Sequence, residues 1–156
     1  MPAPHDFQQS IGKQRAAWIA PGGKLLAGGQ AVDIGAILIE SGTAVLEPYV
    51  FAGETLTQWE LRIPVFRVPP GAFVLKAVAT CGLSVFDWEQ SDNVIWAIDV
   101  VHTEVDTGSQ QFFVVPHLGN LGLGNTTIKS VSYHVTVFLG GTDVFHRDEV
   151  LRELEG

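Results

Sequence analysis

The segment 57–68 reads TQWELRIPVFRV, and its alternation of apolar and polar residues decides the fold class. Its apolar positions are Trp59, Leu61, Ile63 and Val65. Successive side chains of a strand point to opposite faces, so this spacing predicts a β-strand with one buried and one polar face. Pro64 has no amide hydrogen to donate to a neighbouring strand, which predicts an edge position or a bulge there.

Segments of the same kind recur through the rest of the chain, separated by turn residues. The spacing predicts further strands over residues 33–40, 43–51, 73–88, 94–105, 111–115 and 126–139. Asp148 predicts the cap of a short helix that runs to Leu154. The fold class we expect is therefore all-β: a jelly-roll-like two-sheet β-sandwich or barrel with a short C-terminal helix.

Two predicted strands carry most of the expected core. In the last one, one face holds Val131, Tyr133, Val135, Val137 and Leu139. In the segment 73–88, the same alternation predicts an inward face with Phe73, Leu75, Ala77, Ala79, Cys81, Leu83 and Val85. Cys81 is thus expected to be a core residue. It is the only cysteine, so a disulfide within the chain and a zinc site of the CxxC type are excluded.

The first 30 residues have three prolines, five glycines and no sustained hydrophobic period. This composition predicts an extended N-terminal arm, residues 1–30, ahead of a single β-sandwich domain, residues 31–156. The arm is mildly basic, whereas the body is acidic. We expect the arm to bind a neighbouring protein subunit, with five anchors: Phe7, Ile11, Lys13, Arg15 and Trp18.

Charge excludes two classes of partner. Only 17% of the residues are charged and the net charge is −8. Between Lys76 and Lys129 there is no lysine or arginine, although this stretch holds six acidic residues. Binding to nucleic acid or to an anionic membrane surface needs lysine and arginine, so we expect neither partner. The longest uncharged stretch, residues 107–128, contains a proline and several amide side chains, which excludes a spanning helix.

No catalytic motif is evident, and we expect neither an enzyme nor a cofactor. The best metal candidate is the set His102, Glu104 and Asp106, which would share one face of a strand. A polar strand end explains these residues equally well, so no metal site is expected there. The three carboxylates of the loop 87–93 suggest calcium, but a solvated turn accounts for them more simply.

Two further functions stay open as alternatives. One is a carbohydrate-binding or receptor-binding module, such as a phage tail or fibre component, with Asp87, Trp88, Asp92 and Trp96 at a loop-end site. The other is a metal-dependent jelly-roll enzyme that uses His102 and Glu104. The cupin pattern of His-X-His with a downstream glutamate is absent from the sequence, which disfavours the enzyme.

Part of the first third of the chain resembles a known family. The stretches APGG (residues 20–23), KLLAGG (24–29) and DIGAIL (33–38) are similar to tailed-bacteriophage head decoration, or cement, proteins. The resemblance implies a non-enzymatic virion protein, assembled in the host cytoplasm, that stabilises the shell. It implies a homotrimer or homodimer whose partner is the major capsid protein or another virion subunit. The low charge and the predicted arm favour assembly in the same way.

Overall fold

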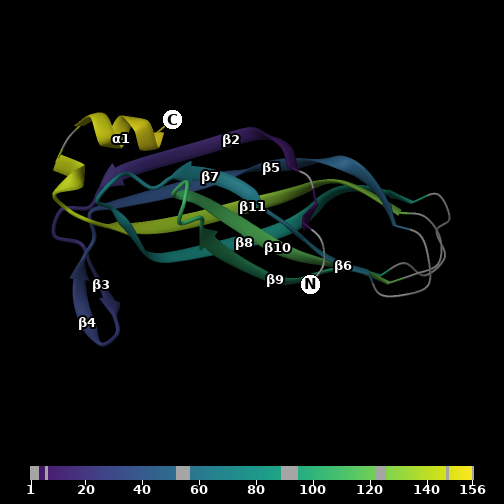
Figure 1. Cartoon of the computed structure of the whole chain (residues 1–156), viewed down its shortest axis with the longest axis horizontal. Helices are drawn as coiled ribbons and strands as arrows, with labels where there is room; N and C mark the ends of the chain where they lie inside the picture. Colours follow the sequence, from purple (N-terminus) through teal and green to yellow (C-terminus); the bar gives the residue numbers. More distant parts are fainter. Residues whose placement is uncertain are drawn as a thin grey trace.

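The computed structural model describes residues 4–5, 7–51, 57–88, 95–121, 126–146 and 148–155. It confirms a mostly β protein with antiparallel sheets and one short helix, α1 (Asp148–Glu155), at the C-terminal end (Figure 1). A short 3-10 turn, η1 (Val144–His146), precedes the helix. In the part of the chain that the structure covers, no helix has the length and apolarity needed to cross a membrane.

One sheet has four antiparallel strands in the order β2 (Phe7–Ile19), β5 (Ala36–Phe51), β11 (Thr126–Gly140) and β8 (Phe73–Trp88). The sequence predicted the bounds of β8 correctly. It predicted two strands over residues 33–51, whereas β5 is continuous from Ala36. The turn expected between residues 40 and 43 is absent because this segment stays paired with β11 on one side and β2 on the other.

The second sheet has five strands, centred on β10 (Gln111–Leu121). On one side of β10 lies β9 (Ile95–Val105), and on the other lie β6 (Thr57–Leu61) and β7 (Ile63–Arg67) in succession. The short β1 (Pro4–His5) pairs with β6 in parallel. Opposite Pro64 the register of β10 shifts between Phe112 and Phe113, which confirms the predicted irregularity.

A separate two-stranded ribbon, β3 (Lys24–Ala27) and β4 (Gln30–Asp33), projects from the molecule at the same end as α1 (Figure 1). Leu26 on this ribbon is exposed. Lys24 Nζ lies 3.0 Å from Asp33 Oδ1 across the ribbon, in an exposed ion pair.

The inner faces of the two sheets share one hydrophobic core. Residues of both sheets and of α1 belong to it, among them Leu38, Val135, Ile63, Val114 and Leu154. All five residues expected to form the inner face of the last strand are buried. In β8, Ala77, Ala79 and Cys81 pack against the core as expected, but Phe73 is exposed. The expectation for Phe73 was wrong because the pairing of β8 with β11 shifts between Phe138 and Leu139, which reverses the alternation.

Residues 7–19 differ from the predicted arm. They form β2, which pairs with β5 from Phe7↔Leu46 to Ile19↔Ala36 and so belongs to the four-stranded sheet. The sequence did not predict this strand because its apolar and polar residues do not alternate regularly along its whole length. Gly12 has a φ of 61°, and the register shifts between Ile11 and Gln14, so the alternation is interrupted halfway along the strand.

Candidate functional site

The predicted arm anchors fall on both faces of β2. Ala17 lies in the core, so its neighbour Trp18 points outward, where it is 41% exposed. Ile11 and Lys13 are also exposed. For Phe7 the structure describes the backbone alone.

Arg15 points inward and its guanidinium joins four elements. Nε donates to Glu40 Oε1 of β5 at 2.8 Å, and Nη1 donates to the Leu154 carbonyl of α1 at 3.0 Å. Nη2 donates to the Val65 carbonyl of β7. The other carboxylate oxygen of Glu40 accepts a 2.9 Å hydrogen bond from the Tyr133 hydroxyl. Arg15 is therefore engaged within the chain. The expected contact of this residue with a partner subunit stays a prediction.

The outer side of the four-stranded sheet is apolar at the end near α1. The register places Trp18, Ile37, Phe138 and Lys76 in one row across the four strands, and Ala16, Ile39, Thr136 and Val78 in the next. Beside these rows the Phe73 ring lies against Gly140, where an added Cβ would be 2.5 Å from a ring atom. We call this region the apolar outer face; its residues are Trp18, Ile37, Ile39, Phe73, Val78 and Phe138.

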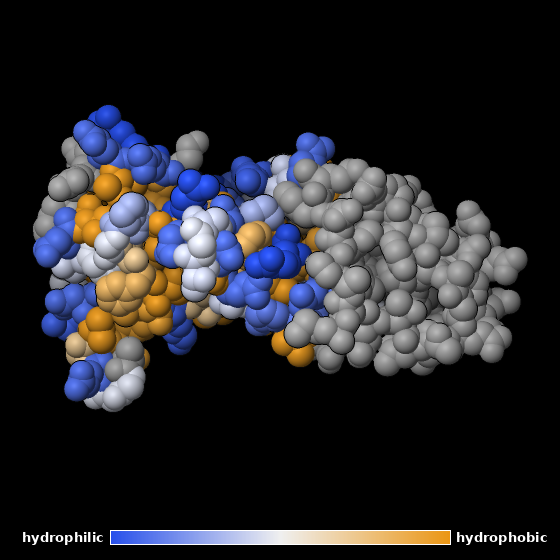
Figure 2. Space-filling view, in the orientation of Figure 1, coloured by the Kyte–Doolittle hydropathy of each residue, from blue (hydrophilic) through white to orange (hydrophobic). Residues whose placement is uncertain are grey.

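Three of these six side chains are well exposed: Trp18 at 41%, Phe73 at 52% and Val78 at 50%. In the view of Figure 2, hydrophobic surface gathers at the end of the molecule that carries α1 and the β3–β4 ribbon, and the middle of the molecule is mainly hydrophilic. Apolar surface that gathers in one place on a charge-poor protein is typical of a binding face.

A polar cluster occupies the five-stranded sheet. His117 Nε2 lies 3.1 Å from His102 Nδ1, and His102 Nε2 lies 3.5 Å from Glu104 Oε2. Glu60 Oε2 is 3.5 Å from His117 Nε2, and Arg62 Nη2 is 2.6 Å from Glu104 Oε1. Among the residues that the structure covers, no three His, Cys, Asp or Glu side chains are placed to hold a metal ion.

The sequence predicted part of this cluster. It placed His102 and Glu104 on one face of a strand, and the contact between their side chains agrees with that. Asp106 does not join them: it lies in the turn after β9, where its carboxylate accepts hydrogen bonds from the hydroxyl and amide of Ser109, and these lower its pKa. His117 and Glu60 were missed, because only the pairing of β10 with β6 and β9 brings them close.

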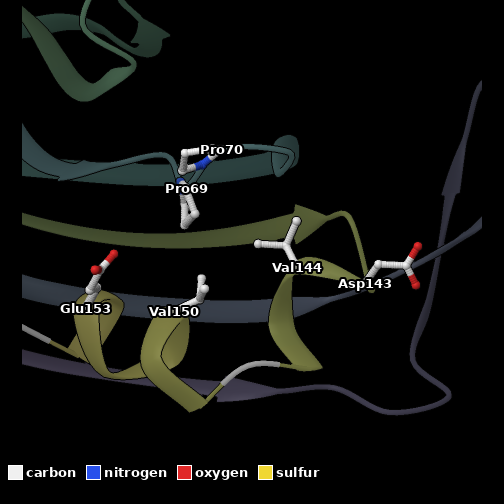
Figure 3. Close-up of a pocket in the computed structure, with 6 residues that line it drawn as sticks. All are labelled: Pro69, Pro70, Asp143, Val144, Val150 and Glu153. Carbon is white, nitrogen blue, oxygen red and sulfur yellow. The ribbon is translucent and has the colours of Figure 1, made fainter.

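A shallow hollow of about 340 Å³ lies between the β7–β8 turn and the C-terminal segment (Figure 3). It is lined by Pro69, Pro70, Asp143, Val144, Val150 and Glu153. Only two of these side chains ionise, and both are acidic. This lining offers neither a nucleophile nor a base paired with an acid, so the hollow does not suggest catalysis.

The loop-end residues proposed for sugar binding are not placed by the structure. Asp92 lies outside the described residues, as do residues 89–91. For Asp87, Trp88 and Trp96 the backbone alone is described.

Comparison with known proteins found no matching family model, no matching curated protein and no matching solved structure. The resemblance to phage decoration proteins therefore stays a prediction.

Proposed function

We propose that this chain is a non-enzymatic structural protein that binds other protein subunits through its apolar outer face. The observation that carries this proposal is the exposure of Trp18, Phe73 and Val78 on one side of a single sheet. The free energy of an apolar side chain of this size is lower when it is buried than when it is in contact with water, so a partner that covers these three side chains is favoured.

The energetics indicate how much of the face a partner must cover. Fully burying a large apolar side chain contributes about 1.5–3 kcal/mol, so burying the exposed halves of three contributes roughly 3 kcal/mol. Association costs about 4–15 kcal/mol in lost freedom of motion. These three residues alone cannot hold a partner. A partner must therefore also cover Ile37, Ile39 and Phe138 and contribute apolar surface of its own.

The finer form of the proposal comes from the resemblance of residues 20–38 to decoration proteins. In that form, the chain is a jelly-roll-like sandwich that assembles as a dimer or trimer on a virion shell. It reinforces the major capsid protein by burying area at subunit junctions. The first partner to test is therefore a phage capsid shell.

The experiment compares a double variant of the apolar outer face with a control variant on the other sheet. Trp18→Thr/Val78→Thr removes two apolar side chains from the face while keeping residues that favour strands. Val100→Thr, on β9 of the other sheet, is the control, because Val100 is 49% exposed and Val78 is 50% exposed.

We expect the double variant to lower self-association or binding to capsid shells at least tenfold in sedimentation velocity and pull-down measurements. The control should bind as the wild type does. Equal binding by all three proteins would refute the proposed face, provided that circular dichroism shows each to be folded.

A further inference from the structure

Two histidines of the five-stranded sheet meet on its outer side, away from the apolar outer face. His102 pairs in register with Val115 and His117 with Val100, so the two histidines are diagonal neighbours on β9 and β10. His117 Nε2 and His102 Nδ1 are 3.1 Å apart, and both side chains are partly exposed. A small ion from solvent can therefore reach both nitrogens.

The separation of these nitrogens fits two ligands of one metal ion. Zinc binds imidazole nitrogen at about 2.0–2.1 Å, and two such bonds with 3.1 Å between the nitrogens enclose an angle of about 100°. That angle lies between the octahedral and the tetrahedral values. The same spacing allows one ring to donate a hydrogen bond to the other when no metal is bound.

A carboxylate lies on the far side of His102, where metal-binding histidines usually have one. The other ring nitrogen of His102, Nε2, lies 3.5 Å from Glu104 Oε2. Glu104 is in turn held by Arg62, whose Nη2 is 2.6 Å from Oε1. The Arg62 guanidinium lies 4.2 Å from the centre of the Phe113 ring. A carboxylate in this place selects the form of the imidazole that leaves Nδ1 free to coordinate.

A second carboxylate supplies negative charge beside the pair. Glu60 Oε2 lies 3.5 Å from His117 Nε2, the proposed ligand atom. With Glu60 and Glu104 against Arg62, the cluster has a formal charge of −1 when both imidazoles are neutral, which favours a cation. As the side chains stand, no third protein ligand is in place within the described ranges, so water completes the coordination.

We propose that His102 and His117 form a two-imidazole chelate for a divalent transition metal such as Zn²⁺. His102 Nδ1 and His117 Nε2 are the ligand atoms, and Glu104 is a positioning residue. In the metal-free pair, His117 Nε2 donates its hydrogen to His102 Nδ1, and His102 carries its own hydrogen on Nε2, toward Glu104. When the metal binds, the His117 hydrogen moves through solvent from Nε2 to Nδ1. Both rings stay neutral, so no proton is gained or lost by the pair.

The test uses the full chain without an affinity tag, stripped of metal with a chelator and titrated with ZnCl₂ by calorimetry. We expect one Zn²⁺ per chain. His102→Ala and His117→Ala should each weaken binding at least tenfold, and Glu104→Gln should weaken it about tenfold. His134→Ala is the matched control, because His134 is an exposed histidine on β11 of the other sheet, and it should leave binding unchanged.

The proposal is overturned if the wild type binds no Zn²⁺, or if either His102→Ala or His117→Ala binds as tightly as the wild type. Unchanged affinity in Glu104→Gln would overturn its positioning role. If a variant does not fold, the ring ¹⁵N signals of the wild type decide. Zn²⁺ should shift His102 Nδ1 and His117 Nε2, and a shift confined to other histidines would contradict the site.

Discussion

The Arg15 side chain satisfies backbone carbonyls at two places where the regular hydrogen bonding of the fold ends. β7 is a terminal strand of its sheet, and the last turn of a helix leaves carbonyls unpaired. Arg15 donates to a carbonyl at each of these places, Val65 and Leu154, and neutralises Glu40, which is 0% exposed. A buried pair of this kind costs desolvation, but losing one partner costs more, since the other charge then stays buried alone.

Replacing this cation alone should therefore be severe. We expect Arg15→Met to lower the free energy of unfolding by about 3–5 kcal/mol, measured by urea denaturation. Arg15→Met/Glu40→Met should recover a large part of this loss, because no uncompensated charge remains. A single variant within about 1 kcal/mol of the wild type would contradict the assigned role of the pair.

Alkaline pH should destabilise the protein through one half-buried group, Cys81, and one buried group, Tyr133. Burial raises the pKa of the Cys81 thiol from 9.0 to about 12. Burial, together with the Glu40 carboxylate, raises the pKa of Tyr133 from 10.0 to about 12. Between the ordinary and the raised values, the unfolded chain loses protons that the folded chain keeps, so the stability falls as the pH rises.

We therefore expect these two groups to leave the free energy of unfolding unchanged with pH below about 8 and to reduce it from pH 9 to 12. Chemical denaturation at a series of pH values measures this. Cys81→Ala and Tyr133→Phe should each make the alkaline decline shallower. If the free energy of unfolding declines as steeply in both variants as in the wild type, other groups cause the alkaline decline.

At the scale of elements, the turn after β11 depends on a glycine. Gly141 has a φ of 95°, and a Cβ there would lie 2.8 Å from the Gly71 carbonyl oxygen. Its own carbonyl accepts from the Val144 amide at 3.0 Å, at the start of η1. The turn thus sets the direction in which the chain leaves the sheet toward η1.

We expect Gly141→Ala to lower the free energy of unfolding by at least about 2 kcal/mol, because it adds backbone strain to a backbone clash. Gly108→Ala is the control, since the nearest atom to its added Cβ would be 3.6 Å away and φ is not in the left-handed region. Thermal unfolding of the two variants measures the difference. Equal melting temperatures would contradict the role of Gly141.

β2 gives a second prediction at this scale. An extended arm could be removed without loss of the fold, but β2 pairs with β5 and supplies Arg15 to the core. We expect deletion of residues 1–18 to abolish cooperative unfolding, because β5 loses a neighbour and Glu40 loses its cation. Circular dichroism during heating distinguishes the two cases. A folded, cooperatively melting truncation would support the arm.

At the scale of the whole molecule, the two sheets present different outer surfaces. One carries the apolar outer face, and the other carries the cluster of His102, His117, Glu60, Glu104 and Arg62. The proposed assembly uses the first surface and leaves the second open to solvent. A protein with this division can bind a partner on one side and an ion on the other independently.

We expect the free chain to self-associate through the apolar outer face. Sedimentation at micromolar concentrations should give a mass of two or three chains of 16.9 kDa. The association should persist at high salt, since the contacts are apolar. A single 16.9 kDa species at all concentrations would exclude the homo-oligomer. It would leave binding to a different protein as the role of the face.

The candidate sites were only partly visible in the sequence. Trp18 and His102 could be singled out as chemically notable residues on strands. Their neighbours could not. Phe138 joins the row of Trp18, and Val78 joins the next row, only through the pairing of β11 with β5 and β8. His117 meets His102 only through the pairing of β10 with β9. Contacts between strands that are far apart in the sequence produce no pattern in the residues next to either partner.

What the sequence by itself determined is the strand content and the buried face of β11, because alternation along one strand depends only on side chains next to one another. It also determined that the chain carries few charges. Only the tertiary structure decided that residues 7–19 join a sheet, that Phe73 points outward and that Arg15 points inward. Bulges and register shifts set these directions, and a shift of one residue reverses every side chain beyond it.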